Sequence, residues 1–476
     1  MTTPRLCETV TAPTMAELIA ARDAASAADL VELRLDGVDR PDVAGALAGR
    51  TRPVIVTCRP LWEGGRFDGS EDGRRRLLEQ ALAAGAEYVD VEWQAGFADL
   101  IASDPARIVI SSHDFSGVPR DLADRVRAMR ATGAGTIKVA VMARRLSDTL
   151  PLRDIAREGR AVVIGMGDAG IITRLLPARF GSCWTYGGNA VAPGQVPAAR
   201  MRREFRFADV APSTRLFGIV SPNAMHSLSP AMHNAAFATA GIDAVYLPMA
   251  AADFQDFETF AAAMGVEGVS VTIPFKLDAL AAAATADALT RDVGAANTLR
   301  RRDGTWEATN TDVEGFLAPL VEAFGGPIAG TRAAVLGAGG AARAVAVALR
   351  AHGACVTLHA RREAQAAAVA ADTGVAAGGW PPAAGWDLLV NTTPLGGTGH
   401  RDESPLPGAA FTGRLVYDLT YGPGESRLLR DARAAGCRTL DGLPMLVAQA
   451  ERQFAWWTGQ AAPPGVMKRA VRGPGL

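Results

Sequence analysis

The chain has 476 residues with 49% hydrophobic and 21% charged side chains, a composition that is typical of globular proteins and predicts two to four domains. Its net charge of −1, without a long run of one sign, argues against a nucleic-acid or membrane-surface partner. The five cysteines lack metal-ligand spacing, and the sequence shows neither a signal peptide nor a membrane span, so we expect a metal-free cytoplasmic protein with reduced thiols.

Eight short β-rich runs alternate with helical patterns through the first 190 residues. These runs are LCETV from Leu6, LVELRLD from Leu30, PVIVTCR from Pro53, AEYVDVEW from Ala86, ARIVISSHD from Ala106, GTIKVAV from Gly135, AVVIGMG from Ala161 and CWTYGG from Cys183. The patterns between them, such as SEDGRRRLLEQALAAGAE, have helical periodicity. Eight strands at this regular pitch predict a (β/α)8 TIM barrel, whose working face lies at the C-terminal ends of the strands.

Lysine is rare in this chain, because only Lys138, Lys276 and Lys468 are lysines among 49 basic residues. Arginine does not lose its proton in a protein, whereas a lysine amine can lose it and then attack a carbonyl group. Lys138 stands in the middle of an apolar strand, so we interpret it as a chemically active residue. Lys468 lies in a polar tail and is interpreted as a surface residue.

Other polar side chains stand near the ends of successive strands of the predicted barrel. They are Glu32 and Arg34, Arg59, Glu92 and His113, followed by Lys138. A single strand that ends in a charge is ordinary, because loops are polar. Five such strands in succession indicate an active site, since a barrel directs all of these ends into one mouth.

The first half resembles type I 3-dehydroquinate dehydratase over about residues 5 to 205. The motifs that carry the resemblance are VELRLDG from Val31, TCRP from Thr57 with EGG ending at Gly65, SSHDF from Ser111, IKVAVM from Ile137 and GNAVAPGQ from Gly188. The resemblance implies that Lys138 forms a Schiff base with the substrate ketone and that His113 transfers the proton. It further implies that Glu92 orients His113.

The same resemblance implies a set of substrate-binding residues. The hydroxyls and the carboxylate of the substrate would be held by Glu32, Arg34, Arg59 and Arg174, with Gln195 on a closing loop. Arginine suits a carboxylate because its fork binds both oxygens, and the positive charges would help to lower the pKa of Lys138. Val191 stands where the family has serine, which bears on one substrate hydrogen bond and not on the chemistry at Lys138.

A change of pattern separates the two halves of the chain. Residues 196 to 216 carry a basic cluster and two prolines before a new strand begins. We therefore expect a barrel domain over 1–208 and a second region over 213–476. The second region would contain a substrate domain over 213–315, completed by the C-terminal helices, and a Rossmann domain over 328–445.

The clearest motif of the second half is TRAAVLGAGGAARAVAVALRAHG, which begins at Thr331. A strand runs into Gly337, Gly339 and Ala342 and a long helix follows, which is the context of a dinucleotide fingerprint. After the next strand an NAD enzyme would place an acid on the ribose, but this chain has Arg361 and Arg362. Two cations in place of the acid favour the 2′-phosphate of NADP.

Seven motifs in order make residues 215 to 470 look like shikimate dehydrogenase. They are FGIVSPNAMHSLSPAMHNAAF from Phe217, GVSVTIPFK from Gly268, GAANTL from Gly294, NTDVEGF from Asn310, NTTPLG from Asn391, YDLTYGP from Tyr417 and DGLPMLVAQA from Asp441. The resemblance assigns Ser227 and Ser229 to the substrate carboxylate, and Lys276 with Asp312 to proton transfer. His226 and His233 receive no role.

The resemblance also implies the rest of the reduction site. The ring hydroxyls of the substrate would be lined by Thr272, Asn297, Tyr421 and Gln449. The cofactor would be bound by Gly337, Ala338, Gly339, Gly340, Ala341, Arg361, Arg362, Thr392 and Gly442.

Together the two resemblances imply a bifunctional lyase and oxidoreductase of the shikimate pathway, which serves chorismate and aromatic amino acid biosynthesis. It would convert 3-dehydroquinate to 3-dehydroshikimate and reduce this product to shikimate with NADPH, as a monomer or homodimer whose partners are small molecules. Two alternatives remain open. One is a ligand-sensing regulator similar to the fungal quinate repressor, and the other is an NAD-dependent quinate dehydrogenase.

Overall fold

The computed structural model describes residues 3–188 and 194–471. Its internal contacts divide the chain into two compact units. The first unit contains Met1–Arg215, Pro222–His226 and Asp243–Gly265, and the second contains Leu216–Ser221, Ser227–Ile242 and Val266–Leu476. Among the helices of the described residues, none combines the length and the apolar surface that a membrane crossing requires.

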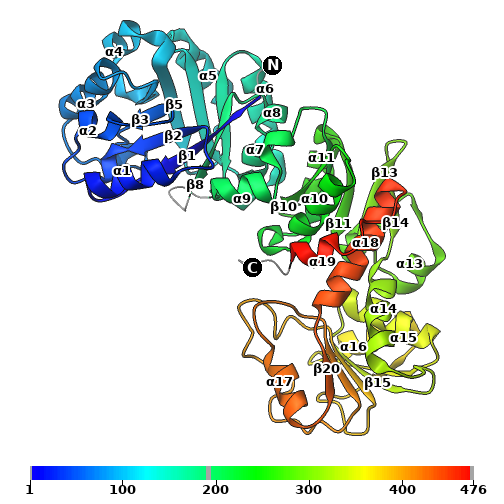
Figure 1. The fold of residues 1–476 in the computed structure, drawn as a ribbon. Helices are drawn as coiled ribbons and strands as arrows, with labels where there is room; N and C mark the ends of the chain where they lie inside the picture. The colour runs from blue at the N-terminus through cyan, green and yellow to red at the C-terminus, as the bar shows by residue number, and fades with distance from the viewer. Residues whose placement is uncertain (1–2, 189–193, 472–476) are drawn as a thin grey trace. The chain divides into compact units, whose positions relative to one another are not determined.

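The first unit contains an eight-stranded parallel sheet (Figure 1). Its strands are β1 (Arg5–Val10), β2 (Leu30–Arg34), β3 (Val54–Thr57), β4 (Tyr88–Glu92), β5 (Ile108–Asp114), β6 (Thr136–Met142), β7 (Ala161–Met166) and β8 (Trp184–Gly188). The hydrogen-bonded order is β7-β6-β5-β4-β3-β2-β1-β8. The N–H of Cys183 donates to the carbonyl of Ala161 at 2.9 Å and so joins the two ends. The predicted TIM barrel is confirmed.

Helices alternate with the barrel strands. They are α1 (Met15–Ala24), α2 (Val43–Leu47), α3 (Glu71–Ala83), α4 (Ala98–Ser103), α5 (Leu122–Ala131), α6 (Leu150–Arg157), α7 (Gly167–Leu175), α8 (Pro177–Phe180) and α9 (Ala198–Arg203). Side-chain oxygens of Thr14, Asp42 and Ser70 accept hydrogen bonds from the first turns of α1, α2 and α3, which explains where these helices begin. The unit also contains β10 (Ala244–Met249) and α11 (Phe254–Met264).

The second unit contains two sheets. In the first sheet, five neighbouring strands are joined by hydrogen bonds. Their order is β9 (Arg215–Val220), β11 (Val266–Val271), β13 (Thr298–Arg302), β14 (Thr305–Thr309) and β12 (Thr285–Ala286). The helices of this region are α10 (Ser229–Thr239), α12 (Lys276–Ala282), α13 (Ala288–Val293), α14 (Asp312–Phe324), α18 (Leu443–Thr458) and α19 (Val466–Ala470).

The other sheet is parallel, and its order is β17-β16-β15-β18-β19-β20. The strands are β15 (Arg332–Leu336), β16 (Cys355–His359), β17 (Ala376–Gly378), β18 (Leu388–Asn391), β19 (Leu415–Asp418) and β20 (Arg438–Leu440), with helices α15 (Gly340–Ala351), α16 (Glu363–Thr373) and α17 (Arg427–Ala434). Counted from β15, this is the strand order 3-2-1-4-5-6 of dinucleotide-binding folds, so the predicted Rossmann fold is confirmed.

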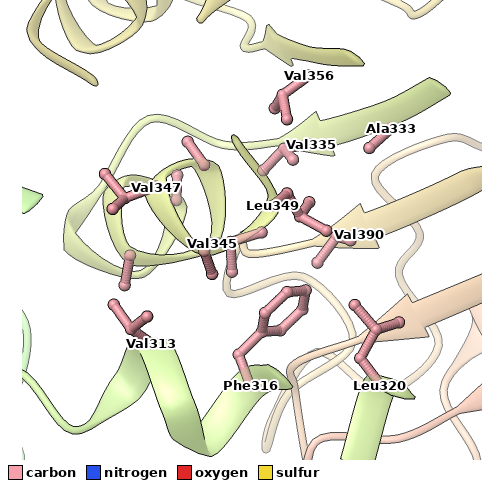
Figure 2. Close-up of a cluster of buried hydrophobic side chains, with 14 of the residues drawn as sticks. Val313, Phe316, Leu320, Ala333, Val335, Val345, Val347, Leu349, Val356 and Val390 are labelled. Carbon is pink, nitrogen blue, oxygen red and sulfur yellow. The ribbon is translucent and has the colours of Figure 1, made fainter. Parts of the chain in front are cut away.

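A buried apolar cluster holds the start of this Rossmann sheet in place (Figure 2). The cluster contains valines of α15, among them Val345 and Val347, together with Phe316 of α14. On the sheet side the cluster includes Val335 and Val390 from the neighbouring strands β15 and β18. Because all of these side chains are almost fully buried, they fix the position of α15 and of the glycine-rich turn that precedes it.

Candidate active sites

A cavity of about 150 Å³ lies where the barrel strands end. The structure brings seven residues predicted from the sequence together around it: Glu32, Arg34, Arg59, His113, Lys138, Arg174 and Gln195. Gln195 Nε2 donates to Thr9 Oγ1 at 3.5 Å. Val191 lies outside the described residues. The chemical roles of the seven residues stay predictions.

Lys138 is buried on β6, and its Nζ is enclosed by two carboxylates and an aromatic ring. Its Nζ lies 3.1 Å from Glu32 Oε1 and 3.0 Å from Asp90 Oδ2. The centre of the Tyr186 ring is 4.3 Å away. Burial alone would raise the pKa of Asp90, but Arg59 and Lys138 outweigh it and hold this pKa well below its ordinary value. Asp90 is therefore ionised at neutral pH, with its Oδ2 3.0 Å from Lys138 Nζ.

His113 is oriented by Glu63, and not by Glu92 as predicted. Nδ1 of His113 lies 2.8 Å from Glu63 Oε1, and the backbone N–H of His113 donates to the same oxygen at 2.8 Å. Glu92 lies on the neighbouring strand, but Arg59 donates to its Oε1 at 2.7 Å and Arg74 of α3 donates to its other oxygen. Two buried arginines thus hold Glu92 away from the imidazole.

The surroundings shift the pKa values of His113 and Glu63 in opposite directions. Burial, with Arg59 and Lys138 adding to it, lowers the pKa of His113 well below its ordinary value. The imidazole is therefore neutral at pH 7 and can accept a proton. Burial raises the pKa of Glu63 to about 7, against the opposing charge of Arg59. Glu63 consequently changes its charge near neutral pH.

Three arginines add positive charge to the cavity. Arg34 makes two hydrogen bonds of 2.8 Å to Asp36, and Arg59 contacts Asp90 at 2.9 Å. Arg174 of α7 donates to the carbonyl of Tyr186 at 3.1 Å, and burial lowers its pKa to about 10. Burial of a charged guanidinium group costs free energy, and a bound anion offsets part of this cost. The cavity is therefore suitable for a substrate carboxylate.

Lys276 and Asp312 form a close pair in the second unit. Lys276 begins α12, Asp312 begins α14, and Nζ lies 2.6 Å from Asp312 Oδ2. The amide of Asn297 donates to the other carboxylate oxygen at 2.8 Å. The pair is mostly buried, with side-chain exposures of 12% and 8%. An ammonium group held by a buried carboxylate is placed to donate a proton.

The other predicted substrate residues come from several elements of the second region. Ser229 begins α10, and its N–H donates to Ser227 Oγ at 3.1 Å. Gln449 is buried on α18 beside Gly315 of α14. Thr272 follows β11, and burial raises the pKa of Tyr421. The contacts of these residues with a substrate stay predictions.

The glycine-rich turn lies between β15 and α15, as the fingerprint predicted. Gly337 has a φ of +116°, and a side chain there would also meet Thr392 Oγ1. At Gly339, the residue before α15, an added Cβ would have no neighbour within 4 Å. Such a bare turn at a helix N-terminus can receive a pyrophosphate, so the residues fit a dinucleotide.

The remaining predicted cofactor residues differ in their surroundings. Arg361 and Arg362 are exposed between β16 and α16, so both can reach a ligand. Thr392 donates to the carbonyl of Leu336 at 2.7 Å. Gly442 is packed against the backbone of Leu419, which leaves no room for a side chain. This contact is enough to explain the glycine, and a bound cofactor is not needed to explain it.

Comparison with known proteins identifies the family. The model for type I 3-dehydroquinase matches residues 6–211, that for the shikimate dehydrogenase substrate-binding domain matches 219–299, and that for the shikimate 5′-dehydrogenase C-terminal domain matches 442–472. A chloroplastic bifunctional 3-dehydroquinate dehydratase/shikimate dehydrogenase of Arabidopsis thaliana is 32% identical over 92% of this chain and 78% of its own. The chain belongs to the bifunctional 3-dehydroquinate dehydratase/shikimate dehydrogenase family.

Other relatives of this bifunctional enzyme match its second half. Shikimate dehydrogenase (NADP(+)) of Moorella thermoacetica is 41% identical over 55% of this chain and 94% of its own. A shikimate dehydrogenase solved in complex with NADP+ is 32% identical over 55% of this chain and 96% of its own, with a TM-score of 0.51. The two predicted activities, a lyase and an oxidoreductase of the shikimate pathway, are confirmed, which favours catalysis over a regulator.

Sequence reasoning missed two residues of the dehydratase site. Asp90 stands in YVDVEW with Val89 and Val91 on either side, and a carboxylate within an apolar strand was a usable signal. Glu63 belongs to a short 3-10 helix, Leu61–Glu63, that follows β3. No strand pattern marks a residue in such a loop, although Glu63 lies within a motif that carried the resemblance.

Proposed function

We propose that the barrel dehydrates 3-dehydroquinate through a Schiff base on Lys138. The observation that carries this proposal is the single cavity in which a buried lysine, a neutral histidine and several arginines face the same space. The lysine amine attacks the ketone carbon, and water leaves as the iminium forms. The iminium withdraws electrons, so the neighbouring C–H becomes acidic and His113 removes its proton. The protonated His113 then returns the proton to the departing hydroxyl group, which leaves as water. A water molecule finally hydrolyses the iminium, which releases the product ketone and frees the Lys138 amine.

Borohydride trapping tests the Schiff base directly. Incubation with 3-dehydroquinate and borohydride should reduce the iminium and leave the substrate skeleton attached to Lys138, which peptide mass spectrometry would detect. The peptides of Lys276 and Lys468 serve as internal controls, since the chain has only three lysines. A label on another residue, or no label, would exclude the proposed intermediate.

We predict that Glu63 gives the dehydratase a pH dependence near neutrality. The carboxylate must be ionised to accept the Nδ1 proton of His113 and so leave Nε2 free as a base. Because the pKa of Glu63 is about 7, kcat/KM for 3-dehydroquinate should rise with pH up to about 7 and level off above it. In Glu63→Gln this rising limb should vanish and activity should stay low throughout. A limb that persists in Glu63→Gln would belong to another group.

We propose that the second unit reduces 3-dehydroshikimate with NADPH, with Lys276 as the proton donor. The cofactor would lie on the turn of Gly337 and Gly339, and when bound it supplies the hydride. Lys276 would protonate the alkoxide oxygen, while Asp312 holds and directs the amine. Ser227 and Ser229 would hold the substrate carboxylate.

The proposed choice of NADPH depends on two exposed arginines. We predict that replacing both Arg361 and Arg362 with alanine raises the KM for NADPH about a hundredfold or more, because hydrogen bonds to a charged phosphate contribute about 1.5–3 kcal/mol each. The KM for NADH, which has no 2′-phosphate, should change little and serves as the control. Equal effects on both cofactors would assign these arginines to a different part of the nucleotide.

We infer that the partners of this enzyme are its small-molecule substrates and NADPH. The matched family models and the chemistry of the two sites support this inference. A cytoplasmic location and a monomeric or homodimeric state stay predictions from the sequence.

A further inference from the structure

The glycines before α15 are not all explained by backbone conformation. Gly337 has a positive φ, which alanine adopts only with strain. Gly339 has a φ of −102°, and Gly340 is the first residue of α15, with no positive φ. Alanine would fit the backbone at both of these positions and is the better helix former. The reason for a glycine at Gly339 and at Gly340 must therefore lie in the atoms that surround each position.

That space differs between the two neighbours. A Cβ added at Gly339 would meet no atom within 4 Å, so this position is open. A Cβ added at Gly340 would lie 2.8 Å from Cδ of Lys276, 3.4 Å from its Cβ and 3.6 Å from its Cγ. The aliphatic stem of the lysine thus lies directly against Gly340.

The lysine has little freedom to move away, because both ends of the residue are held. Its backbone carbonyl accepts a hydrogen bond from Ala296 N–H at 2.9 Å. Its Nζ lies 2.6 Å from Asp312, which Asn297 fixes in turn with a 2.8 Å hydrogen bond. A methyl group at Gly340 would consequently displace the middle of the side chain and lengthen the contact between Nζ and Asp312.

We propose that Gly340 is a positioning residue for Lys276, and that its missing side chain serves the proton donor rather than the cofactor. Gly339 supplies the open space on the cofactor side. This inference rests on the proposed role of Lys276 in proton transfer. According to this proposal, the glycine-rich turn and the Lys276 side chain are in direct contact. The turn would receive the dinucleotide, and the Lys276 amine would protonate the product.

Substitutions at Gly340 and Gly339 distinguish the positioning of Lys276 from the binding of the cofactor. The first experiment needs neither a bound cofactor nor catalytic turnover. An amine-acylating reagent is added to the cofactor-free full chain, and the labelling rate of Lys276 is read by peptide mass spectrometry against Lys468. Gly340→Ala should raise this rate about fivefold or more, because a displaced amine loses its charged partner. Gly339→Ala should leave it within about twofold. Equal rates in the two variants would overturn the inference.

Binding and turnover provide the second comparison. From NADPH fluorescence, Gly340→Ala should keep the Kd for NADPH within about twofold while kcat for shikimate oxidation falls about tenfold to a hundredfold. Gly339→Ala should raise the Kd by about tenfold or more. Dehydratase activity of the same chain reports intact folding. A Gly340→Ala enzyme that loses NADPH affinity but keeps kcat would contradict the inference, whereas an active Lys276→Met enzyme would instead contradict the proposed function.

Discussion

Replacement of Lys138 by arginine is expected to lower dehydratase turnover by at least about 10⁴-fold, because the substitution removes the only group proposed to bond to the substrate. Guanidinium keeps its proton and cannot attack the ketone. The charge itself would be retained, and Glu32 and Asp90, both about 3 Å from Nζ in the native enzyme, would still have a cationic partner. The loss would therefore report nucleophilicity and not charge. Initial rates of 3-dehydroshikimate formation measure the effect.

Two controls accompany this substitution. Shikimate oxidation by the Lys138→Arg chain should stay within about twofold of the wild-type rate, because that site uses other residues. Lys468→Arg, a change of the same kind in the short helix α19, should leave both activities unaltered. Dehydration that continues in Lys138→Arg at more than about a tenth of the native rate would exclude covalent catalysis through this lysine.

Strand-end residues of the barrel could be predicted because the fold itself brings them together. Inward-pointing polar side chains of the barrel strands face the same mouth, so Glu32, His113 and Lys138 could be placed together without information about distance. The partner of His113 could not be predicted in this way. Glu63 lies 50 residues before it in a loop, and the position of a loop depends on tertiary packing.

The error at Glu92 has a similar physical cause. Strand periodicity directs Asp90 and Glu92 to the same side of β4, but it does not say which cation each carboxylate meets. Arg74, a helix residue without any motif, pairs with Glu92. In the second half the order of motifs identified Lys276 and Asp312, whereas the contact between Lys276 and Gly340 joins segments 64 residues apart and has no sequence signal.

Lys276→Met should lower kcat for shikimate dehydrogenation by about 10²- to 10⁴-fold, the usual contribution of a general acid or base. Methionine has a similar length and an unbranched stem, so it can still pack against Gly340 while it offers no proton. The Kd for NADPH should remain within about twofold, since the variant retains the glycine-rich turn. Given 3-dehydroquinate and NADPH, the variant should accumulate 3-dehydroshikimate, which chromatography would quantify.

Asp312→Asn completes this test, because the two residues form a single unit. A neutral amide attracts and orients the Lys276 amine less strongly than a carboxylate does, so this variant should also lose most of its turnover. If the ammonium acts only when the carboxylate directs it, the double variant should be little slower than Lys276→Met alone. Losses that multiply would mean that Lys276 and Asp312 act independently, and the 2.6 Å contact would then be structural rather than catalytic.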